Sequence, residues 1–360
     1  MPPLRAPNCF RLMTISGLAS RCALVAVLLL PPAGAGAAGL DTKRADVQAF
    51  IAETARRSGM SAEEIRAALA ACTIQQGILD AMERPAERTK PWKEYRAIFL
   101  TPERVDAGAA FWREHEAQLA RVSARTGVPP EILVAIVGVE TYFGRRTGTY
   151  RILDSLATLA FEYPPRAKFF QSELGEFFQL AREEKLDVLK VSGSYAGAMG
   201  PAQFIPSSYR KLAVDGDGDG RRDLLSNWDD IFASVANYFV ANQWQAGQGV
   251  VTRGSVVPPF VPKPPDNKLA AMETVASLGR QGVRFSTDLG QDAPAGLIAL
   301  EGDEGPEYWV GFQNFYVITR YNRSAMYALA VWQLGQSMAE AIHAGPDGPL
   351  RSAPIPANAH

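Results

Sequence analysis

The sequence has little cysteine, no strong excess of either charge, and no apolar run long enough to span a membrane. Two of its three cysteines, Cys9 and Cys22, lie within the first forty residues, so only Cys72 remains for the rest of the chain. No disulfide can form within that part, and Cys72 is expected to be a small buried hydrophobic residue. Lys and Arg number 37 against 38 Asp and Glu, which excludes the basic footprint of a nucleic-acid-binding protein.

Residues 1–37 have the pattern of a cleavable signal peptide. Three arginines accompany an apolar run at residues 23–30, and residues 35–37 have the small-x-small pattern that signal peptidase cuts after. The run is too short for a permanent membrane helix. Cys22 follows an arginine where bacterial lipoproteins have a small residue, so lipoprotein anchoring is not supported, and a retained N-terminal anchor is the alternative. Removing the segment lowers the basic count from 37 to 34 and gives a net charge of −4.

The remaining chain predicts a mainly α (α+β) fold without internal repeats. Helical periodicity dominates up to about residue 246, and Ser61 with Glu64 predicts a capping box. Short strand-like runs then alternate with Gly, Pro and Asp, before a helix returns at residues 324–342. The predicted parts are an N-terminal helical subdomain (41–125), a catalytic core with an acidic loop (126–247), a small antiparallel β subdomain (248–320), a C-terminal helix returning to the helical subdomain (321–344) and a disordered tail (345–360).

Glu140 is the candidate catalytic residue. Two prolines at 129–130 predict the start of a helix that Gly144 would end, and helical spacing places Glu140 on one face with Ile136 and Phe143. Burial of a carboxyl without a cationic partner raises its pKa, so it keeps the proton that a general acid must donate to a glycosidic oxygen. A glutamate that turns to solvent at a fraying helix end is the alternative, and the helix pattern does not decide between them.

No second carboxyl stands out as a partner for Glu140, although most glycosidases use two. Asp154 is expected to be the N-cap of the segment 155–161, and Glu162 ends that segment. Without a second carboxylate, a reaction would need a route in which the substrate supplies the nucleophile.

Several motifs stand in a fixed order along the chain. They are GVETYFG at 138–144, LATLAF at 156–161, Tyr163-Pro164 with Arg166-Ala167, GSYAGAMG at 193–200, Gln203-Phe204 and SVANYF at 234–239. In order and spacing over most of residues 45–343, the sequence resembles the membrane-bound lytic murein transglycosylase B family.

The resemblance implies a lysozyme-like catalytic core with an additional helical subdomain and a small β subdomain, acting on peptidoglycan. The bond cleaved would be the β-1,4 link from N-acetylmuramic acid to N-acetylglucosamine. Glu140 would act as acid and then as base while the muramic acid 6-hydroxyl attacks C1, leaving a 1,6-anhydro end. The location implied is the periplasm of a Gram-negative bacterium.

The resemblance also implies a set of substrate-binding residues. Those carried over are Ser194, Gln203, Tyr238, Tyr321, Asn322, Tyr95, Tyr327, Arg166 and Met199. A tyrosine can pack its ring on a sugar while its hydroxyl forms a hydrogen bond. Ordinary packing is the alternative for each tyrosine. Family members usually have two arginines after Tyr-Pro, but Pro165 stands here before Arg166, so Arg166 would make the cationic contact alone.

Residues 215–223 (DGDGDGRRD) predict a calcium loop. Asp215, Asp217, Asp219, Gly220 and Asp223 match positions 1, 3, 5, 6 and 9 of an EF-hand loop. Carboxylates so close together repel one another without a cation, and hard oxygen ligands favour Ca²⁺. Position 12 is a serine, and in the extended loop of the resembled family Asp229 would replace it as a ligand. We expect a structural Ca²⁺ and no organic cofactor, the alternative being an exposed acidic turn without an ion.

Three functions are compatible with these features. The lytic transglycosylase leads, a muramidase-type hydrolase using the same Glu140 is the second candidate, and a calcium-dependent cell-wall binding module without activity is the third. The partners expected are peptidoglycan glycan strands, with cell-wall synthesis or division proteins as candidates and no nucleic acid. We expect a monomer.

Overall fold

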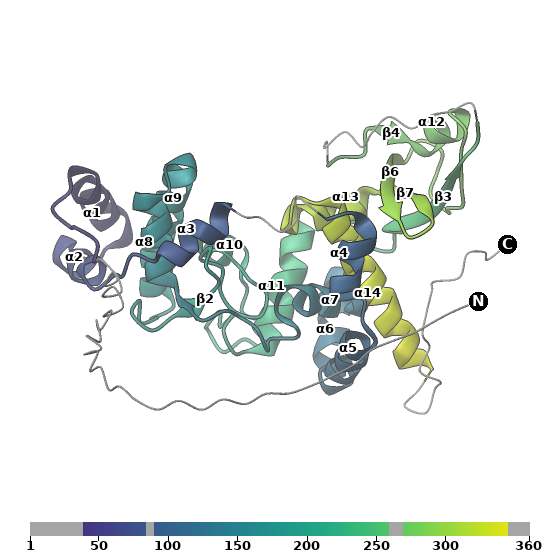
Figure 1. The fold of residues 1–360 in the computed structure, drawn as a ribbon. Helices are drawn as coiled ribbons and strands as arrows, with labels where there is room; N and C mark the ends of the chain where they lie inside the picture. The colour runs from purple at the N-terminus through teal and green to yellow at the C-terminus, as the bar shows by residue number, and fades with distance from the viewer. Residues whose placement is uncertain (1–38, 84–89, 259–268, 345–360) are drawn as a thin grey trace, which may run out of the picture. The chain divides into compact units, whose positions relative to one another are not determined.

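The computed structural model describes residues 39–83, 90–258 and 269–344. Within these residues the fold is mainly helical, with a five-stranded antiparallel sheet and a two-stranded one (Figure 1). The predicted mainly α (α+β) class is therefore confirmed. The expected signal peptide at 1–37 and the expected disordered tail at 345–360 lie outside the described residues.

The order of elements follows the predicted change from helices to strands and back to a helix. The helices are α1 Ala45–Ser58, α2 Ala62–Ala70, α3 Gln76–Glu83, α4 Trp92–Phe99, α5 Pro102–Glu114, α6 Glu116–Thr126, α7 Pro130–Thr141, α8 Ile152–Glu162, the short 3-10 helix η2 Pro164–Arg166, α9 Ala167–Glu183, α10 Pro206–Leu212, α11 Trp228–Ala241, α12 Val275–Arg280, α13 Gln313–Tyr321 and α14 Ala325–His343. The strands are β1 Tyr150–Arg151, β2 Ser192–Gly193, β3 Val251–Val256, β4 Glu273–Thr274, β5 Val283–Phe285, β6 Pro294–Gly302 and β7 Gly305–Phe312.

Short polar side chains start several helices where the sequence places them. The predicted capping box is confirmed, since the Ser61 hydroxyl accepts the Glu64 N–H and the Glu64 carboxylate accepts the Ser61 N–H. Thr101 caps α5 and Ser324 caps α14 in the same way. Such caps satisfy N–H groups that have no partner within the helix, so they fix the residue at which each helix begins.

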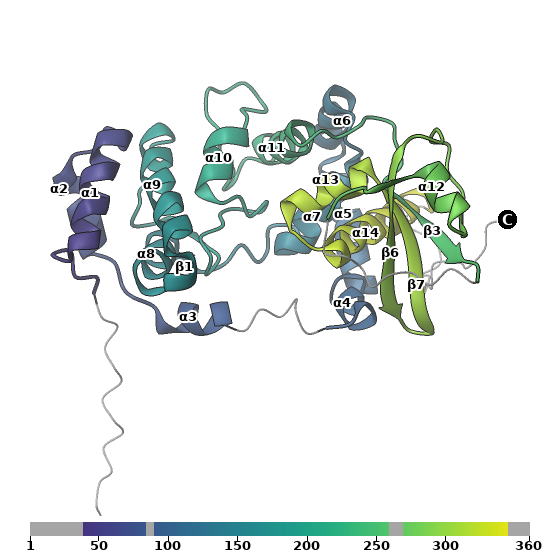
Figure 2. The ribbon, with the colours of Figure 1, turned by 90° about the horizontal axis from the view of Figure 1, so that it is seen from above.

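The structure divides the predicted N-terminal helical subdomain between two groups of helices. In the first group, α1 packs on α2 and α9 while α3 packs on α8 (Figure 2). In the second, α4 and α5 pack on α14, and α6 packs on α7 and α11. Residues 41–125 therefore contribute helices to both groups. Amphipathic periodicity shows which face of a helix is buried but not which helix covers it.

The five-stranded sheet has the order β4-β6-β7-β3-β5, and all its pairs are antiparallel. Together with α12 it encloses a small core of its own, formed by Val275, Leu278, Val283, Ala295, Val310 and Phe312. The strands end at Phe312, and α13 then joins the main core through Phe315, Val317 and Ile318. The strands of this sheet thus lie between Val251 and Phe312, within the predicted β subdomain 248–320.

Helix α7 lies in the main core and contacts α5, α6, α11 and α14. A close approach between α7 and α14 is possible because Gly335 has no side chain, since a Cβ there would lie 3.0 Å from the Glu131 carbonyl oxygen. Among the described helices, no single one is long and apolar enough to cross a membrane. The helix pair α6 and α7, which is bent by 116°, has the length and apolar composition of a membrane span, but meets these two criteria alone.

The expected burial of Cys72 is confirmed. It is 3% exposed, and its thiol lies 3.7 Å from the Ala68 carbonyl oxygen and 3.9 Å from that of Leu153. Burial raises the pKa of the thiol to about 12. Cys72 is therefore a protonated packing residue rather than a nucleophile.

The buried carboxyl of Glu173 leads to a prediction about stability and pH. Burial raises its pKa above the ordinary range, although the Ser207 N–H donates to Oε2 at 2.9 Å. The protonated form is thus favoured in the folded state, and its stabilising effect is complete below the ordinary glutamate pKa of about 4.3. The effect decreases as pH rises through the folded-state pKa. We expect Glu173→Gln to raise Tm at pH 7, with a gain that disappears near pH 4.

Thermal unfolding across this pH range measures the effect, with exposed Glu340→Gln on α14 as the control for the loss of one charge. A lower Tm for Glu173→Gln at pH 7, or a difference that does not vary with pH, would contradict the assignment.

Candidate active site

Glu140 lies near the carboxyl end of α7. Pro129 is the N-cap and Pro130 occupies the first helical position, where a missing N–H costs no hydrogen bond. Residues 132–138 are all buried, whereas Glu140 is half-buried. The predicted helix and its buried interior are confirmed, although the helix ends before Gly144. The carboxyl therefore lies at the edge of the core, and the alternative of a side chain turned fully to solvent does not hold.

The end of α7 has an unusual backbone. Tyr142 and Phe143 both have a positive φ, 52° and 59°, which is uncommon for residues with a side chain and costs energy. The turn folds the Phe143 ring back onto Gly138, where a Cβ would lie 2.7 Å from the ring. Thr141 fixes the turn to a distant segment, since its hydroxyl donates to the Pro201 carbonyl at 2.8 Å. The GVETYFG motif thus encodes a helix end of defined shape.

Tyr327 forms a hydrogen bond with the Glu140 carboxyl. Its hydroxyl donates a hydrogen bond of 2.6 Å to Oε1 of Glu140. Tyr327 is 2% exposed and lies in the first turn of α14, where the Ser324 hydroxyl accepts its backbone N–H. Burial raises the pKa of the Tyr327 phenol well above its ordinary value, and the charge of Glu140 raises it further. The phenol therefore keeps its proton and acts as a fixed donor to the carboxylate.

The two other carboxyls considered from the sequence have structural partners. Asp154 lies in the first turn of α8, where it accepts the Thr73 N–H at 2.9 Å and a guanidinium N–H of Arg151 at 2.5 Å. The expectation that Asp154 is an N-cap is wrong, because α8 begins two residues earlier and Arg151 occupies the cap. Glu162 forms an ion pair with Arg44. Neither carboxyl is paired with Glu140.

Ser194 and Gln203 lie on a compact loop that follows β2. The Ser194 hydroxyl accepts the Ala198 N–H at 3.0 Å. Gln203 has a positive φ of 53°, and its side-chain amide donates to the carbonyls of Thr147 at 3.1 Å and Gly200 at 2.9 Å. Both side chains are half-buried and held by local hydrogen bonds. Such pre-positioned polar groups suit the binding of a polar ligand.

Tyr238 on α11 and Tyr321 at the end of α13 lie against each other, with ring centroids 4.8 Å apart. Their hydroxyls donate to the carbonyls of Arg320 at 2.6 Å and Ala202 at 2.7 Å. Phe204 packs edge-on against both rings. These contacts connect three separate segments of the chain.

The contacts also connect Glu140 to this aromatic group. Burial raises the pKa of Tyr321 well above its ordinary value, and the charge of Glu140 raises it further. Tyr321 therefore lies close to Glu140, and Asn322 follows it, half-buried, at the end of α13. The structure thus brings Glu140, Tyr327 and Tyr321 together. Gln203 directly follows Ala202, whose carbonyl accepts the hydrogen bond from the Tyr321 hydroxyl.

Three further residues predicted to bind substrate are Met199, Tyr95 and Arg166. Met199 has no exposed surface, and Tyr95 is 3% exposed. Arg166 is exposed, and its guanidinium stacks over the rings of Phe169 at 4.4 Å and Phe170 at 5.0 Å. No contact in the described structure joins Arg166 to Glu140.

A cavity of about 470 Å³, which the sequence did not indicate, lies beside the aromatic group. It is bordered by the ends of α11 and α13, and its polar lining residues are Asn242, Gln243, Gln313, Tyr316 and Arg320. Its volume is that of a small-molecule site, but none of its described lining residues carries a carboxyl group. This cavity therefore cannot supply a catalytic acid, and Glu140 remains the candidate for that role.

In the acidic loop, carboxylate oxygens of Asp215, Asp217 and Asp230 lie within 4.8 Å of one another. Asp230 on α11 is completely buried. Burial raises the pKa of Asp230, and the charges of Asp217 and Asp215 raise it further. Three carboxylates of which one is buried form a donor set of hard oxygens, and such a set fits Ca²⁺.

Asp229, the ligand expected from the sequence, points away from this group. Its two oxygens accept hydrogen bonds from Gln118 at 2.8 Å and Arg121 at 2.7 Å on α6. Asp230 faces the loop instead, accepting the N–H groups of Gly216 at 2.7 Å and Asp223 at 2.6 Å. Neighbouring helix positions point about 100° apart, so only one of the two can face the loop.

The two remaining aspartates of the loop hold its turns. The Asp219 carboxylate accepts the Arg221 N–H at 2.8 Å, and the Asp223 carboxylate accepts the N–H groups of Leu225 at 2.8 Å and Ser226 at 3.1 Å. Neither belongs to the group of three close carboxylates.

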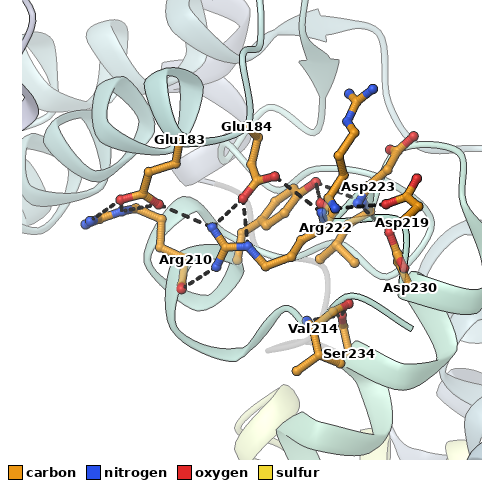
Figure 3. Close-up of polar contacts among 12 residues, drawn as sticks. Glu183, Glu184, Arg210, Val214, Asp219, Arg222, Asp223, Asp230 and Ser234 are labelled. Atoms are coloured by element: carbon orange, nitrogen blue, oxygen red, sulfur yellow. Dashed lines mark hydrogen bonds and ion pairs between the residues drawn. The ribbon is translucent and has the colours of Figure 1, made fainter. Parts of the chain in front are cut away.

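Figure 3 shows how the acidic loop is attached to the rest of the fold. Arg222 donates from Nε to Glu184 at 2.7 Å and pairs with Glu183 at 3.3 Å, and Glu183 also pairs with Arg210 at 2.6 Å. At the other end of the loop, the Val214 N–H donates to the Ser234 hydroxyl on α11 at 2.9 Å. The loop is therefore fixed to α9 and α11 on both sides.

Cleavage of a glycan requires an acid that can reach a glycosidic oxygen, and a half-buried glutamate at a helix end meets this requirement. The fold and the surroundings of Glu140 define a lysozyme-like glycan-cleaving enzyme.

Comparison with known proteins agrees with this class. The family model described as Transglycosylase SLT domain matches residues 42–336. Membrane-bound lytic murein transglycosylase B of Escherichia coli (strain K12) is 42% identical over 305 residues, which is 82% of this chain and 82% of that protein. The chain therefore belongs to the lytic transglycosylases of the SLT-domain family.

Two solved structures of related enzymes contain ligands. The structure of Escherichia coli lytic transglycosylase Slt35 in complex with calcium is 39% identical, with a TM-score of 0.77, covering 88% of this chain and 100% of that chain. The structure of SltB3 from Pseudomonas aeruginosa in complex with NAG-NAM-pentapeptide is 31% identical, with a TM-score of 0.72, covering 82% of this chain and 79% of that chain.

The hydrogen bond from Tyr327 to Glu140 leads to a prediction. Tyr327→Phe removes the donor but keeps the ring, so we expect kcat/KM to fall about tenfold, the loss typical of one hydrogen bond to a charged group, while Tm changes little. The pH profile should also shift, because the phenol no longer stabilises the ionised carboxyl.

Turnover of soluble glycan strands across pH measures both effects, with Tyr308→Phe on β7 as the matched control. An unchanged kcat/KM and an unchanged pH profile for Tyr327→Phe would show that the phenol does not act on Glu140.

Proposed function

We propose that this enzyme cleaves the β-1,4 bond between N-acetylmuramic acid and N-acetylglucosamine in peptidoglycan and leaves 1,6-anhydromuramic acid ends. The observation that carries the proposal is the environment of Glu140, a single half-buried carboxyl fixed by the Tyr327 hydroxyl at 2.6 Å. The pairing of Asp154 with Arg151 and of Glu162 with Arg44 supports it, since both carboxyls are engaged elsewhere.

One carboxyl can perform both proton transfers of this reaction. Protonated Glu140 gives its proton to the glycosidic oxygen as the bond from that oxygen to C1 of the muramic acid breaks. The muramic acid 6-hydroxyl then forms a bond to C1 while Glu140 takes the proton of that hydroxyl. The N-acetyl group of the substrate stabilises the intermediate, so no second carboxylate and no water are required.

Ser194, Gln203, Tyr238, Tyr321 and Asn322 form the sugar-binding part of the site in this proposal. The support is the proximity of Tyr321 to Glu140 and Tyr327, the contacts of Tyr321 with Tyr238 and with the Ala202 carbonyl, and the half-buried state of all five side chains, since half-buried polar groups can select a sugar. Tyr327 acts on Glu140 rather than on the sugar. Met199 and Tyr95 support the site from the core.

The Glu140 assignment predicts a nearly inactive variant. Glu140→Gln keeps the shape of the side chain but can neither give nor take the proton, so we expect release of soluble muropeptides from purified sacculi to fall about 10²–10⁴-fold. Tm should stay close to that of the wild type. Glu131→Gln, in the first turn of the same helix, is the matched control.

A Glu140→Gln variant with wild-type release would refute the catalytic assignment. Muropeptides heavier than the anhydro form by one water would point instead to hydrolysis, and binding to sacculi without cleavage by the wild type would point to a binding module.

The acidic loop is a structural Ca²⁺ site in this proposal, with Asp215, Asp217 and Asp230 as carboxylate ligands. The support is the close approach of the three carboxylates and the calcium in the Slt35 structure. When bound, the ion neutralises these charges, so its role is to hold the loop against α11. Asp229 is left out of this ligand set, because its carboxylate is not among the three that lie within 4.8 Å of one another and is held by Gln118 and Arg121 on α6.

Removal of calcium is expected to destabilise the fold. At calcium concentrations about 100 times Kd, binding contributes about 2.7 kcal/mol, so a chelator should lower Tm by several degrees. Asp217→Asn should abolish most of this calcium-dependent difference, whereas exposed Asp292→Asn should leave it unchanged. Thermal unfolding with and without calcium is the measurement, and an equal Tm in both conditions would exclude the site.

The enzyme acts in the bacterial cell envelope, and residues 1–37 serve as its signal peptide for export to the periplasm. The support is the charge and apolar pattern of this segment and the cell-wall substrate of the related enzymes.

A further inference from the structure

Arg104 on α5 is a buried cation without an acidic partner. It is 9% exposed, and neither its Nε nor one of its terminal nitrogens has a hydrogen-bond partner among the described residues. The guanidinium instead lies over the rings of Phe99 at 5.2 Å and Tyr142 at 5.0 Å. Burial lowers the pKa of Arg104. An uncompensated buried charge is costly, so an arginine in this state indicates a ligand that balances it.

Two further arginines contact the same phenol ring. The guanidinium groups of Arg145 and Arg146 lie 5.5 Å and 5.2 Å from the Tyr142 ring centroid, and both side chains are exposed. Among the ion pairs of the described residues, none includes Arg104, Arg145 or Arg146. Three cations therefore share one aromatic ring, and their mutual repulsion would be relieved by an anion.

This arginine cluster, defined as Arg104, Arg145 and Arg146 around Tyr142, adjoins the catalytic site by two routes. Along the chain, Tyr142 stands two residues after Glu140 at the end of α7. Through space, Phe99 contacts Tyr95 with ring centroids 5.2 Å apart. Tyr95 in turn lies near Tyr327, whose pKa is raised by burial and, to a smaller extent, by this neighbour.

The proposed substrate carries the anions that such a cluster binds. The two sugars of the repeating unit are neutral apart from the acid group of muramic acid, to which the peptide is attached. In peptide-bearing strands the negative charges are therefore peptide carboxylates. A planar guanidinium matches a carboxylate in a paired hydrogen-bond geometry, so arginine is the residue suited to this contact.

We propose that the arginine cluster binds a carboxylate of the peptide carried by the muramic acid next to the cleaved bond, so that the enzyme selects peptide-bearing strands. The proposal rests on the proposed function, since it takes peptidoglycan as the substrate. It also reassigns the cationic contact that the sequence suggested for Arg166, whose guanidinium stacks on Phe169 and Phe170.

The test compares three soluble glycan strands of equal length. The first carries native peptides, the second carries peptides whose carboxylates have been converted to amides, and the third has lost its peptides and keeps the free muramic acid carboxylate. The variants are Arg145→Gln, Arg146→Gln and their combination, because both side chains are exposed and their replacement should not unfold the protein. Arg125→Gln on α6, also exposed, is the matched control.

We expect the double variant to lower the ratio of kcat/KM on native strands to kcat/KM on amidated strands about tenfold, through a higher KM. The control should keep the wild-type ratio. Arg104→Lys, checked by its Tm, should change the ratio in the same direction, because an ammonium does not reproduce the guanidinium geometry.

An equal loss on all three strands would overturn the proposal, as would a loss confined to the third strand, which would assign the cluster to the muramic acid carboxylate. Failure of the proposed function is distinct, because the wild-type enzyme would then release anhydro products from none of the strands.

Discussion

The hydrogen bond from the Tyr327 hydroxyl to Oε1 of Glu140 joins residues 187 positions apart, and the catalytic arrangement depends on it. It requires α7 and α14 to pack closely, which the missing side chain at Gly335 allows. It also requires the phenol to keep its proton, which burial ensures. The tyrosine gives the Glu140 carboxyl one orientation, and a single acid that must first give and then take a proton needs such an orientation.

The rest of the site is arranged around the end of α7. Thr141 ties the helix end to Pro201, and Tyr321 ties the following residue, Ala202, to the end of α13. Gln203 then reaches back to the Thr147 carbonyl. These bonds connect α7, the glycine-rich loop and α13, so that the positions of Glu140 and the polar side chains beside it are mutually fixed. The strained backbone at Tyr142 and Phe143 is maintained by this tertiary structure.

Local sequence patterns predicted the elements of the fold better than their partners. The helix carrying Glu140, the Ser61 capping box and the return of a helix near Ser324 follow from apolar spacing and from residues that satisfy free N–H groups. The division of residues 41–125 between two groups of helices could not be predicted, because periodicity identifies a buried face without identifying what covers it. The predicted start of α8 was also wrong. Asp154 lies inside the first turn of the helix and not at the N-cap, and Arg151 and Thr73 hold its carboxylate there.

The same limit applies to the sites. The spacing of aspartates predicted a metal loop, but the choice between Asp229 and Asp230 depends on Gln118 and Arg121, which lie more than a hundred residues away. The arginine cluster was not predicted at all, because α5 and the end of α7 come together only in the folded chain. The family resemblance suggested Tyr327 as a cleft residue, whereas its contact with Glu140 required the structure.

In the proposed reaction the sugar's own 6-hydroxyl, and not water, attacks C1 after Glu140 has protonated the leaving oxygen. Digestion of purified sacculi in water enriched in ¹⁸O, followed by mass analysis of the muropeptides, distinguishes these two nucleophiles. We expect anhydro-muropeptides that contain no ¹⁸O from the solvent. Products that are one water heavier and carry one ¹⁸O at the new reducing end would contradict the proposed reaction.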